Sequence, residues 1–209
     1  MKYALVFVFL FAVALPTFAA GESALLNVPF TAQAPFGDWS WPWSDFCEEA
    51  SIAMSYSYVT GKQFTARDFA IEMLKLAIYE LQTFGYEKDT NAAETLRMLT
   101  DYYRYPKARI VENPTQQLIR DEISKGNLVI IPAAGKLLQN PYFRAPGPRH
   151  HTLVIKGFDQ SDFIVNDPGT RFGNGYRYSR TNLMEAMHDF VPEPAEITTG
   201  RKAVIVIDK

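Results

Sequence analysis

Two spacings of apolar residues divide the chain into a helical first part and a stranded second part. In the first part, and in one later segment, apolar positions recur every three or four residues, as on a helix with one buried face. The expected helices cover residues 44–61, 65–85, 90–103, 113–127 and 181–190. Each has a capping residue or a glycine near an end, which supports its boundaries.

The second part carries short runs of β-branched residues bounded by Gly, Pro or Asp, which are typical of strands. The expected strands cover residues 128–134, 151–159, 162–168, 176–179 and 202–208. Because helices come first and strands second, the order predicts an α+β fold. In this fold the N-terminal helices pack on a mostly antiparallel sheet.

The N-terminus has the pattern of a secretory signal peptide. Lys2 precedes an apolar run over residues 3–15, Pro16 follows, and small residues suited to cleavage come next. An uncleaved anchor helix is the alternative, but the run is short for a bilayer span and Pro16 interrupts it. We therefore expect a signal peptide over residues 1–20 and a single domain over residues 21–209. The mature protein would be secreted or in the cell envelope, without a stable membrane span.

Composition and charge limit the kinds of partner that we expect the protein to bind. An apolar fraction of 47% can fill a real core, and a net charge of −2 with interspersed signs leaves no basic stripe for nucleic acid. His150 and His151 are adjacent, but side chains diverge along a strand and no third ligand motif accompanies them. We therefore expect no nucleic-acid partner, no metal and no cofactor.

The single cysteine, Cys47, stands at the expected start of the first helix. Exported proteins usually carry cysteines in pairs, so a lone thiol is either a buried apolar residue or a reactive group. With Asp45 as N-cap and Glu48 completing a capping box, Cys47 would lie in the first helical turn. Unpaired N–H groups and the helix dipole there favour an anion and lower the pKa of a thiol. This position favours a nucleophile over a core thiol.

A partner for the thiol comes from the strands. His150 and His151 begin one strand and face opposite sides of it, so one of them can face Cys47. If the chain turns near residue 159 or 160, Asp167 at the end of the next strand comes level with about residue 151 or 152. A carboxylate there can fix the tautomer and orientation of an imidazole. The sequence thus permits a Cys–His–Asp array, with Asp167 as an ordinary turn residue as the alternative.

This order of residues resembles that of papain-fold cysteine peptidases. It is similar above all to their C-39-like branch, which is related to peptidases that trim double-glycine leaders. The shared motifs are "VPFTAQ" from Val28, a cysteine at a helix start, "HTLVIKGFD" from His151 and "NDP" from Asn166. The similarity extends over residues 27–185, which is most of the chain.

The resemblance implies a papain-like fold, cysteine-type peptidase activity and a thioester acyl-enzyme. The family histidine stands six residues before a glycine, here Gly157, which selects His151 rather than His150. The resemblance assigns the third role to Asp167. It assigns Gln33 to the oxyanion hole together with the backbone N–H of Cys47, a surface-loop glutamine being the alternative.

One position departs from the family, which commonly has Gly after the cysteine where this chain has Glu48. A carboxylate there would raise the pKa of the thiol unless it turns outward to cap the helix. Near the array, Trp39, Trp41 and Trp43 either wall a substrate groove or simply pack. The Pro-rich segment 136–149 is either a lid over the cleft or a plain connection.

From these features we expect an exported cysteine peptidase or amide hydrolase whose partner is a peptide or another amide substrate. Cys47 would attack the carbonyl, His151 would move the proton, Asp167 would orient the imidazole, and Gln33 would bind the oxyanion. An acyltransferase with the same site is one alternative, since an amine can replace water. A catalytically weak or inactive binding module at the cell surface is the other, with Glu48 as the mark of lost catalysis.

Overall fold

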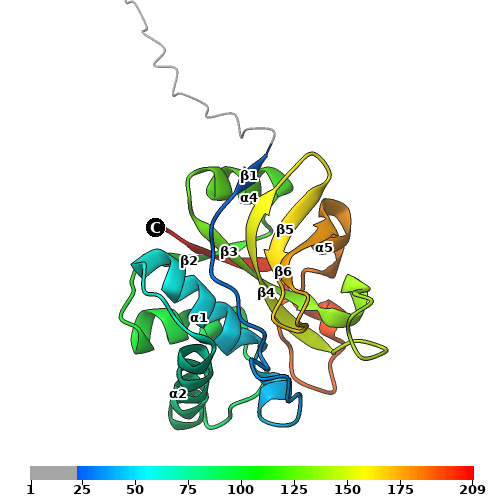
Figure 1. Cartoon of the computed structure of the whole chain (residues 1–209). Coiled ribbons are helices and arrows are strands. Elements are labelled where there is room, and N and C mark those ends of the chain that lie inside the picture. The colour runs from blue at the N-terminus through cyan, green and yellow to red at the C-terminus, as the bar shows by residue number, and fades with distance from the viewer. Residues whose placement is uncertain (1–22) are drawn as a thin grey trace, which may run out of the picture.

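The computed structural model describes residues 23–209, and the expected signal peptide lies outside these residues. Figure 1 shows α1 and α2 at the lower left of the molecule and α5 with β5 and β6 on the right. Within residues 23–209, none of the helices combines the length and the apolarity needed to cross a bilayer.

The predicted helices are all present, with shorter ends than expected. They are α1 (Cys47–Thr60), α2 (Ala66–Phe84), α3 (Ala92–Arg97), α4 (Gln116–Ser124) and α5 (Arg180–Ala186). Short helical turns lie at η1 (Trp43–Asp45), η2 (Met98–Tyr102), η3 (Gly135–Leu138) and η4 (Ile197–Thr199). A capping box of Asn91 with Glu94 begins α3. Helix α4 is capped by Thr115, whose hydroxyl accepts the N–H of Leu118.

The sheet is antiparallel at every pairing among the described strands, which confirms the predicted α+β class. Its order is β2-β7-β3-β4-β5-β6, and β1 pairs with β4. The strands are β1 (Ala24–Leu25), β2 (Ala108–Glu112), β3 (Leu128–Ala134), β4 (His150–Phe158), β5 (Asp162–Asn166), β6 (Asn174–Ser179) and β7 (Ala203–Ile207). Strands β1 and β2 were not expected, because β1 is only two residues long and β2 is a partly exposed edge strand.

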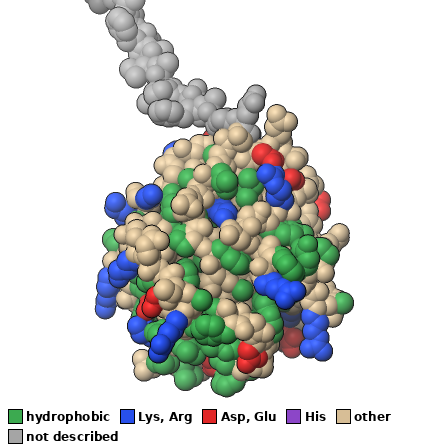
Figure 2. Space-filling view, viewed as in Figure 1, with side chains coloured by type: hydrophobic (Ala, Val, Ile, Leu, Met, Phe, Trp, Pro, Cys, Tyr) green, Lys and Arg blue, Asp and Glu red, His purple; other side chains and the backbone are tan. Residues whose placement is uncertain are grey.

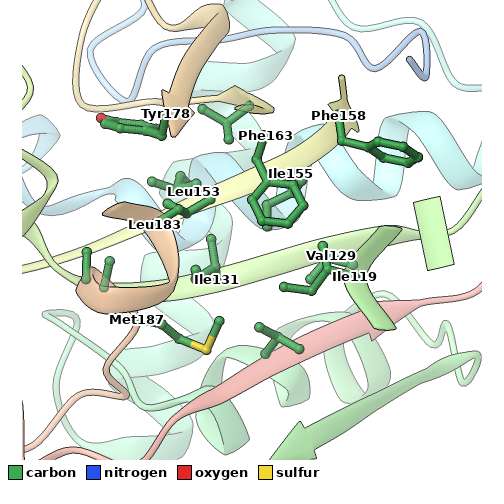
Figure 3. Packing of buried hydrophobic residues seen from close by; sticks show 14 of the residues in the cluster. Ile119, Val129, Ile131, Leu153, Ile155, Phe158, Phe163, Tyr178, Leu183 and Met187 are labelled. Atoms are coloured by element: carbon green, nitrogen blue, oxygen red, sulfur yellow. The ribbon is translucent and has the colours of Figure 1, made fainter. Parts of the chain in front are cut away.

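Strand β3 lies at the centre of the fold and is buried along its whole length. Its alternate residues enter two different cores. Val129 and Ile131 face the core under α4 and α5, part of which is shown in Figure 3. Leu128 and Ile130 face the core under α1, α2 and α3. Apolar layers on both faces therefore hold the sheet, and each buried Ile or Val side chain contributes about 1.5–3 kcal/mol.

The hairpin of β4 and β5 differs in register from the prediction. Val154 lies opposite Asn166, and a bulge follows between Ile155 and Gly157. Continued by one residue, this register puts Asp167 level with residue 153 rather than 151 or 152. The shift arises because the chain turns later than expected, with Phe158 opposite Phe163, and the bulge reduces it by adding one residue to β4.

Candidate active site

Cys47 is the first residue of α1, and its side chain is only 4% exposed. The expected cap is wrong: Asp45 belongs to η1, and the N-cap is Phe46, with no side-chain capping bond. Phe46 is buried and packs edge-on against Trp43 at 5.5 Å between ring centroids. This aromatic pair, anchored by the buried Phe46, determines how the chain enters α1, and Asp45 makes no capping bond to the helix.

Glu48 does not cap the helix either, because it turns into the protein. Its Oε2 accepts a hydrogen bond from the Cys47 thiol at 2.9 Å. Its Oε1 lies 3.0 Å from His150 Nε2 and accepts the backbone N–H of Thr90 at 3.3 Å. Glu48 therefore links the thiol to His150, the histidine that the family resemblance did not select.

The surroundings of Cys47 raise its pKa, contrary to the expected lowering. Burial is the largest cause, and the negative charge of Glu48 is the next, followed by that of Asp89. The position at the start of a helix is the predicted one, but burial and carboxylates outweigh the helix dipole there. In this conformation the thiol is a protonated donor to Glu48.

Glu48 and His150 form a buried ion pair. Burial alone would raise the pKa of Glu48, but the hydrogen bond and charge of His150 lower it below its usual value. Burial likewise opposes the charge of His150, and Glu48 overcomes this and raises the pKa of the imidazole. Burial, and then the charge of Glu48, raise the pKa of nearby Asp89 to about 6.

The second histidine pair matches the prediction. His151 Nε2 lies 2.7 Å from Asp167 Oδ1, and both side chains are buried. Asp167 is completely buried, which would raise its pKa, but the charge of His151 and hydrogen bonds from His151, Tyr178 and Gly169 lower it. Asp167 is therefore a carboxylate, and it contacts His151 through Nε2 rather than Nδ1.

Asp167 has a full set of hydrogen-bond donors. Its Oδ2 accepts the Tyr178 hydroxyl at 2.6 Å and Asn140 Nδ2 at 3.0 Å, and its Oδ1 accepts the N–H of Gly169 at 3.0 Å. Gly169 is also needed for space, because a Cβ there would lie 2.8 Å from Cε1 of His151. Sequence reasoning missed Tyr178 and Asn140; the one available signal was the alternation of β6, which turns Tyr178 inward.

Cys47 and the histidines of both pairs line one cleft of about 930 Å³. Gln33, Trp39, Asp89 and the segments 142–149 and 169–172 also line it. One turn after Cys47, Ser51 Oγ donates to the carbonyl of Thr152 at 3.2 Å. This bond holds the start of α1 against the first residues of β4.

Gln33 lines the cleft, but its amide is engaged elsewhere. Its Nε2 donates to the carbonyls of Trp43 at 2.9 Å and Ser44 at 2.7 Å. An amide nitrogen has two hydrogens, so these bonds use both. In this conformation Gln33 braces the turn before α1, and its role in an oxyanion hole stays a prediction.

The three tryptophans and His188 differ in whether they line the cleft. Trp39 lines the cleft at 40% exposure, whereas Trp41 is 65% exposed outside the cleft lining and Trp43 packs on Phe46. Figure 2 shows hydrophobic side chains gathered at the lower end of the molecule, over α2 and the segment before α1. His188 takes no part in the cleft, since its Nδ1 lies 3.0 Å from the Gly200 carbonyl oxygen.

Comparisons with known proteins agree with this fold. The crystal structure of a candidate C39-like peptidase from Bacillus anthracis is similar, with a TM-score of 0.58 and 18% sequence identity. The match covers 90% of this chain and 99% of that one, so the predicted papain-like α+β fold is confirmed. No curated protein matches the sequence at a significant level. A model of the Peptidase_C39 like family matches residues 25–190. The chain therefore belongs to the Peptidase_C39 like family, a family of peptidases.

Proposed function

We propose that this protein is an exported cysteine peptidase or amide hydrolase that uses Cys47, His151 and Asp167. One observation carries the proposal: His151, paired with buried Asp167 at 2.7 Å, lines the same cleft as a cysteine at the start of a helix. A nucleophile, a base and a residue that orients the base are the three parts of this class of mechanism.

In the first half of the reaction, the thiol proton passes to Nδ1 of His151 and the sulfur attacks the carbonyl carbon of the substrate. The resulting tetrahedral intermediate collapses as His151 returns the proton to the leaving amine, and a thioester remains on Cys47. Asp167 holds the ring and stabilises the imidazolium that forms in between.

In the second half, water enters beside His151, which accepts its proton while the hydroxide attacks the thioester. The acid product leaves and the thiol is restored. The backbone N–H of Cys47 and the amide of Gln33 would stabilise the oxyanion. Gln33 can donate to the oxyanion only after one of its two Nε2 hydrogen bonds, to the carbonyl of Trp43 or to that of Ser44, is broken.

A peptide library tests the proposal. We expect the mature protein to hydrolyse a subset of the peptides, and Cys47→Ala to lower kcat by at least about 10³-fold. Mass spectrometry of the denatured protein should find an acyl adduct on Cys47, made with a slowly deacylated ester substrate. Hydrolysis that persists in the purified Cys47→Ala protein would disprove the assigned nucleophile.

Two alternatives use the same cleft. A binding module with weak or lost catalysis is favoured by the thiol's bond to Glu48 and its raised pKa. It predicts tight peptide binding without turnover in the native protein. Acyl transfer would appear as amide products when an amine is added to the library reaction. Export, which rests on the N-terminal sequence, is tested by recovery of a cleaved protein outside the cytoplasm.

A further inference from the structure

Cys47 shares its cleft with two histidines, each paired with a buried carboxylate, and the proposed function uses only one of these pairs. The unused pair, Glu48 with His150, is the one that the thiol contacts in this structure. One carboxylate oxygen of Glu48 accepts the hydrogen bond of the Cys47 thiol, and the other contacts the imidazole of His150. An ion pair that only stabilised the fold would not need to contact the thiol.

This contact is held in place from several sides. Glu48 is 2% exposed and His150 is 3% exposed, so solvent does not compete for either group. The backbone N–H of Thr90 donates to the oxygen of Glu48 that faces His150. The ring of His150 packs edge-on against Phe190 at 5.3 Å between centroids.

Most of the ionisable groups around the pair are carboxyl groups. From α1 and α2, the carboxyl groups of Glu49 and Glu80 lie near Glu48, and burial raises the pKa of both. Asp89 influences Glu48, His150 and the thiol. Three more distant groups complete the set that faces the pair: Asp45, Arg149 and Asp189. A thiolate at Cys47 would therefore add an anion to a buried region that already holds carboxyl groups, which is unfavourable.

We propose that Glu48, fixed by His150, is a positioning residue that keeps the Cys47 thiol protonated and directed away from His151 in the resting protein. For reaction, the S–H group turns from Glu48 to Nδ1 of His151, and its proton passes to that nitrogen. Glu48 keeps its bond to His150 throughout and takes up no proton. This inference rests on the proposed function only for the second step, because the resting state of the thiol can be measured without a substrate.

The test is a titration of the thiolate by its ultraviolet absorbance, with Cys47→Ala as the blank. Glu48→Gln removes the charge and keeps the shape and a hydrogen-bonding oxygen. We expect the thiolate fraction at pH 7 to rise by about tenfold or more, since each unit of pKa changes it tenfold below the pKa. The rate of alkylation by iodoacetamide should rise less than the thiolate fraction does. We expect a rise of about threefold in rate for each tenfold rise in the thiolate fraction, because a less basic thiolate is a weaker nucleophile.

The matched control is Glu49→Gln, the neighbouring buried carboxyl, because burial raises its pKa well above the usual value and it has the smallest influence among the groups that raise the pKa of the thiol. It should leave the thiol titration nearly unchanged. An unchanged titration in folded Glu48→Gln would overturn the inference. If that variant does not fold, the native protein still tests the inference, because thiolate absorbance of the native protein at pH 7 would also overturn the inference. Neither result depends on peptide hydrolysis, so failure of the inference is distinct from failure of the proposed function.

Discussion

The two carboxylate–imidazole pairs of the cleft have the same chemistry but different surroundings. Asp167, beside His151, accepts hydrogen bonds from Tyr178, Asn140 and Gly169. Glu48, beside His150, lies among buried carboxyl groups. Within residues 23–209, Nδ1 of His150 and one oxygen of Glu49 are buried without a hydrogen-bond partner.

This difference bears on the role of each pair. A fully satisfied carboxylate is rigid and orients its imidazole at little cost, as an orienting residue must. A carboxylate among other acids controls the ionisation of its neighbours instead. We infer that the surroundings of the carboxylate, rather than the residue types alone, distinguish a pair suited to proton transfer from one that sets the state of the thiol.

The largest expected effect separates the two histidines directly. His151→Ala should lower kcat by at least about 10³-fold, because the thiol then has no base. His150→Gln can still donate to Glu48 and should lower kcat by less than about tenfold. The measurement is steady-state hydrolysis of a peptide ester, with circular dichroism to verify folding.

His188→Gln serves as the matched histidine control, since His188 lies outside the cleft. An equal loss in the folded His150 and His151 variants would mean that the cleft does not distinguish its two pairs as we propose.

The next effect concerns stability and the acidic surroundings of Glu48. Burial, and then the charge of Glu48, raise the pKa of Glu80 to about 9, against 4.5 for the free side chain. The folded protein therefore keeps a proton between these values that the unfolded chain loses, so stability falls as pH rises through this window. Glu80→Gln avoids this cost and should add about 1–3 kcal/mol to the free energy of unfolding at pH 8.

Urea unfolding at pH 8 and pH 5 measures this effect, which should be much smaller at pH 5. The exposed Glu196→Gln is the control and should change the unfolding free energy by less than about 0.5 kcal/mol at both pH values. A destabilised Glu80→Gln protein at pH 8 would show that the buried carboxyl does more than repel its neighbours.

The smallest expected effect tests the donors to Asp167. Tyr178→Phe removes the 2.6 Å hydrogen bond and should lower kcat about 3- to 10-fold, which corresponds to about 1 kcal/mol. Tyr176→Phe, on the same strand, is the control and should retain at least about half of the activity. A Tyr178→Phe protein with native kcat would indicate that His151 alone keeps Asp167 in position.

Much of the fold could be predicted from the sequence, because helix and strand periods are local properties. The five helices and the strands from β3 onward follow from apolar spacing and from Gly, Pro and capping residues. The short β1 and the edge strand β2 have too few buried residues to produce such a pattern. The bulge in β4 was also invisible, since it depends on how two strands pair.

The sequence by itself determined the family motifs, the order of Cys47, His151 and Asp167, and the position of the cysteine at a helix start. Only the tertiary structure decided the direction of Glu48, the engagement of Gln33 and the environment of His150. A capping-box spacing is satisfied by residues three apart, but whether a carboxylate turns outward depends on what lies beside it. Here a histidine from a distant strand lies there, and its charge draws Glu48 inward against the thiol.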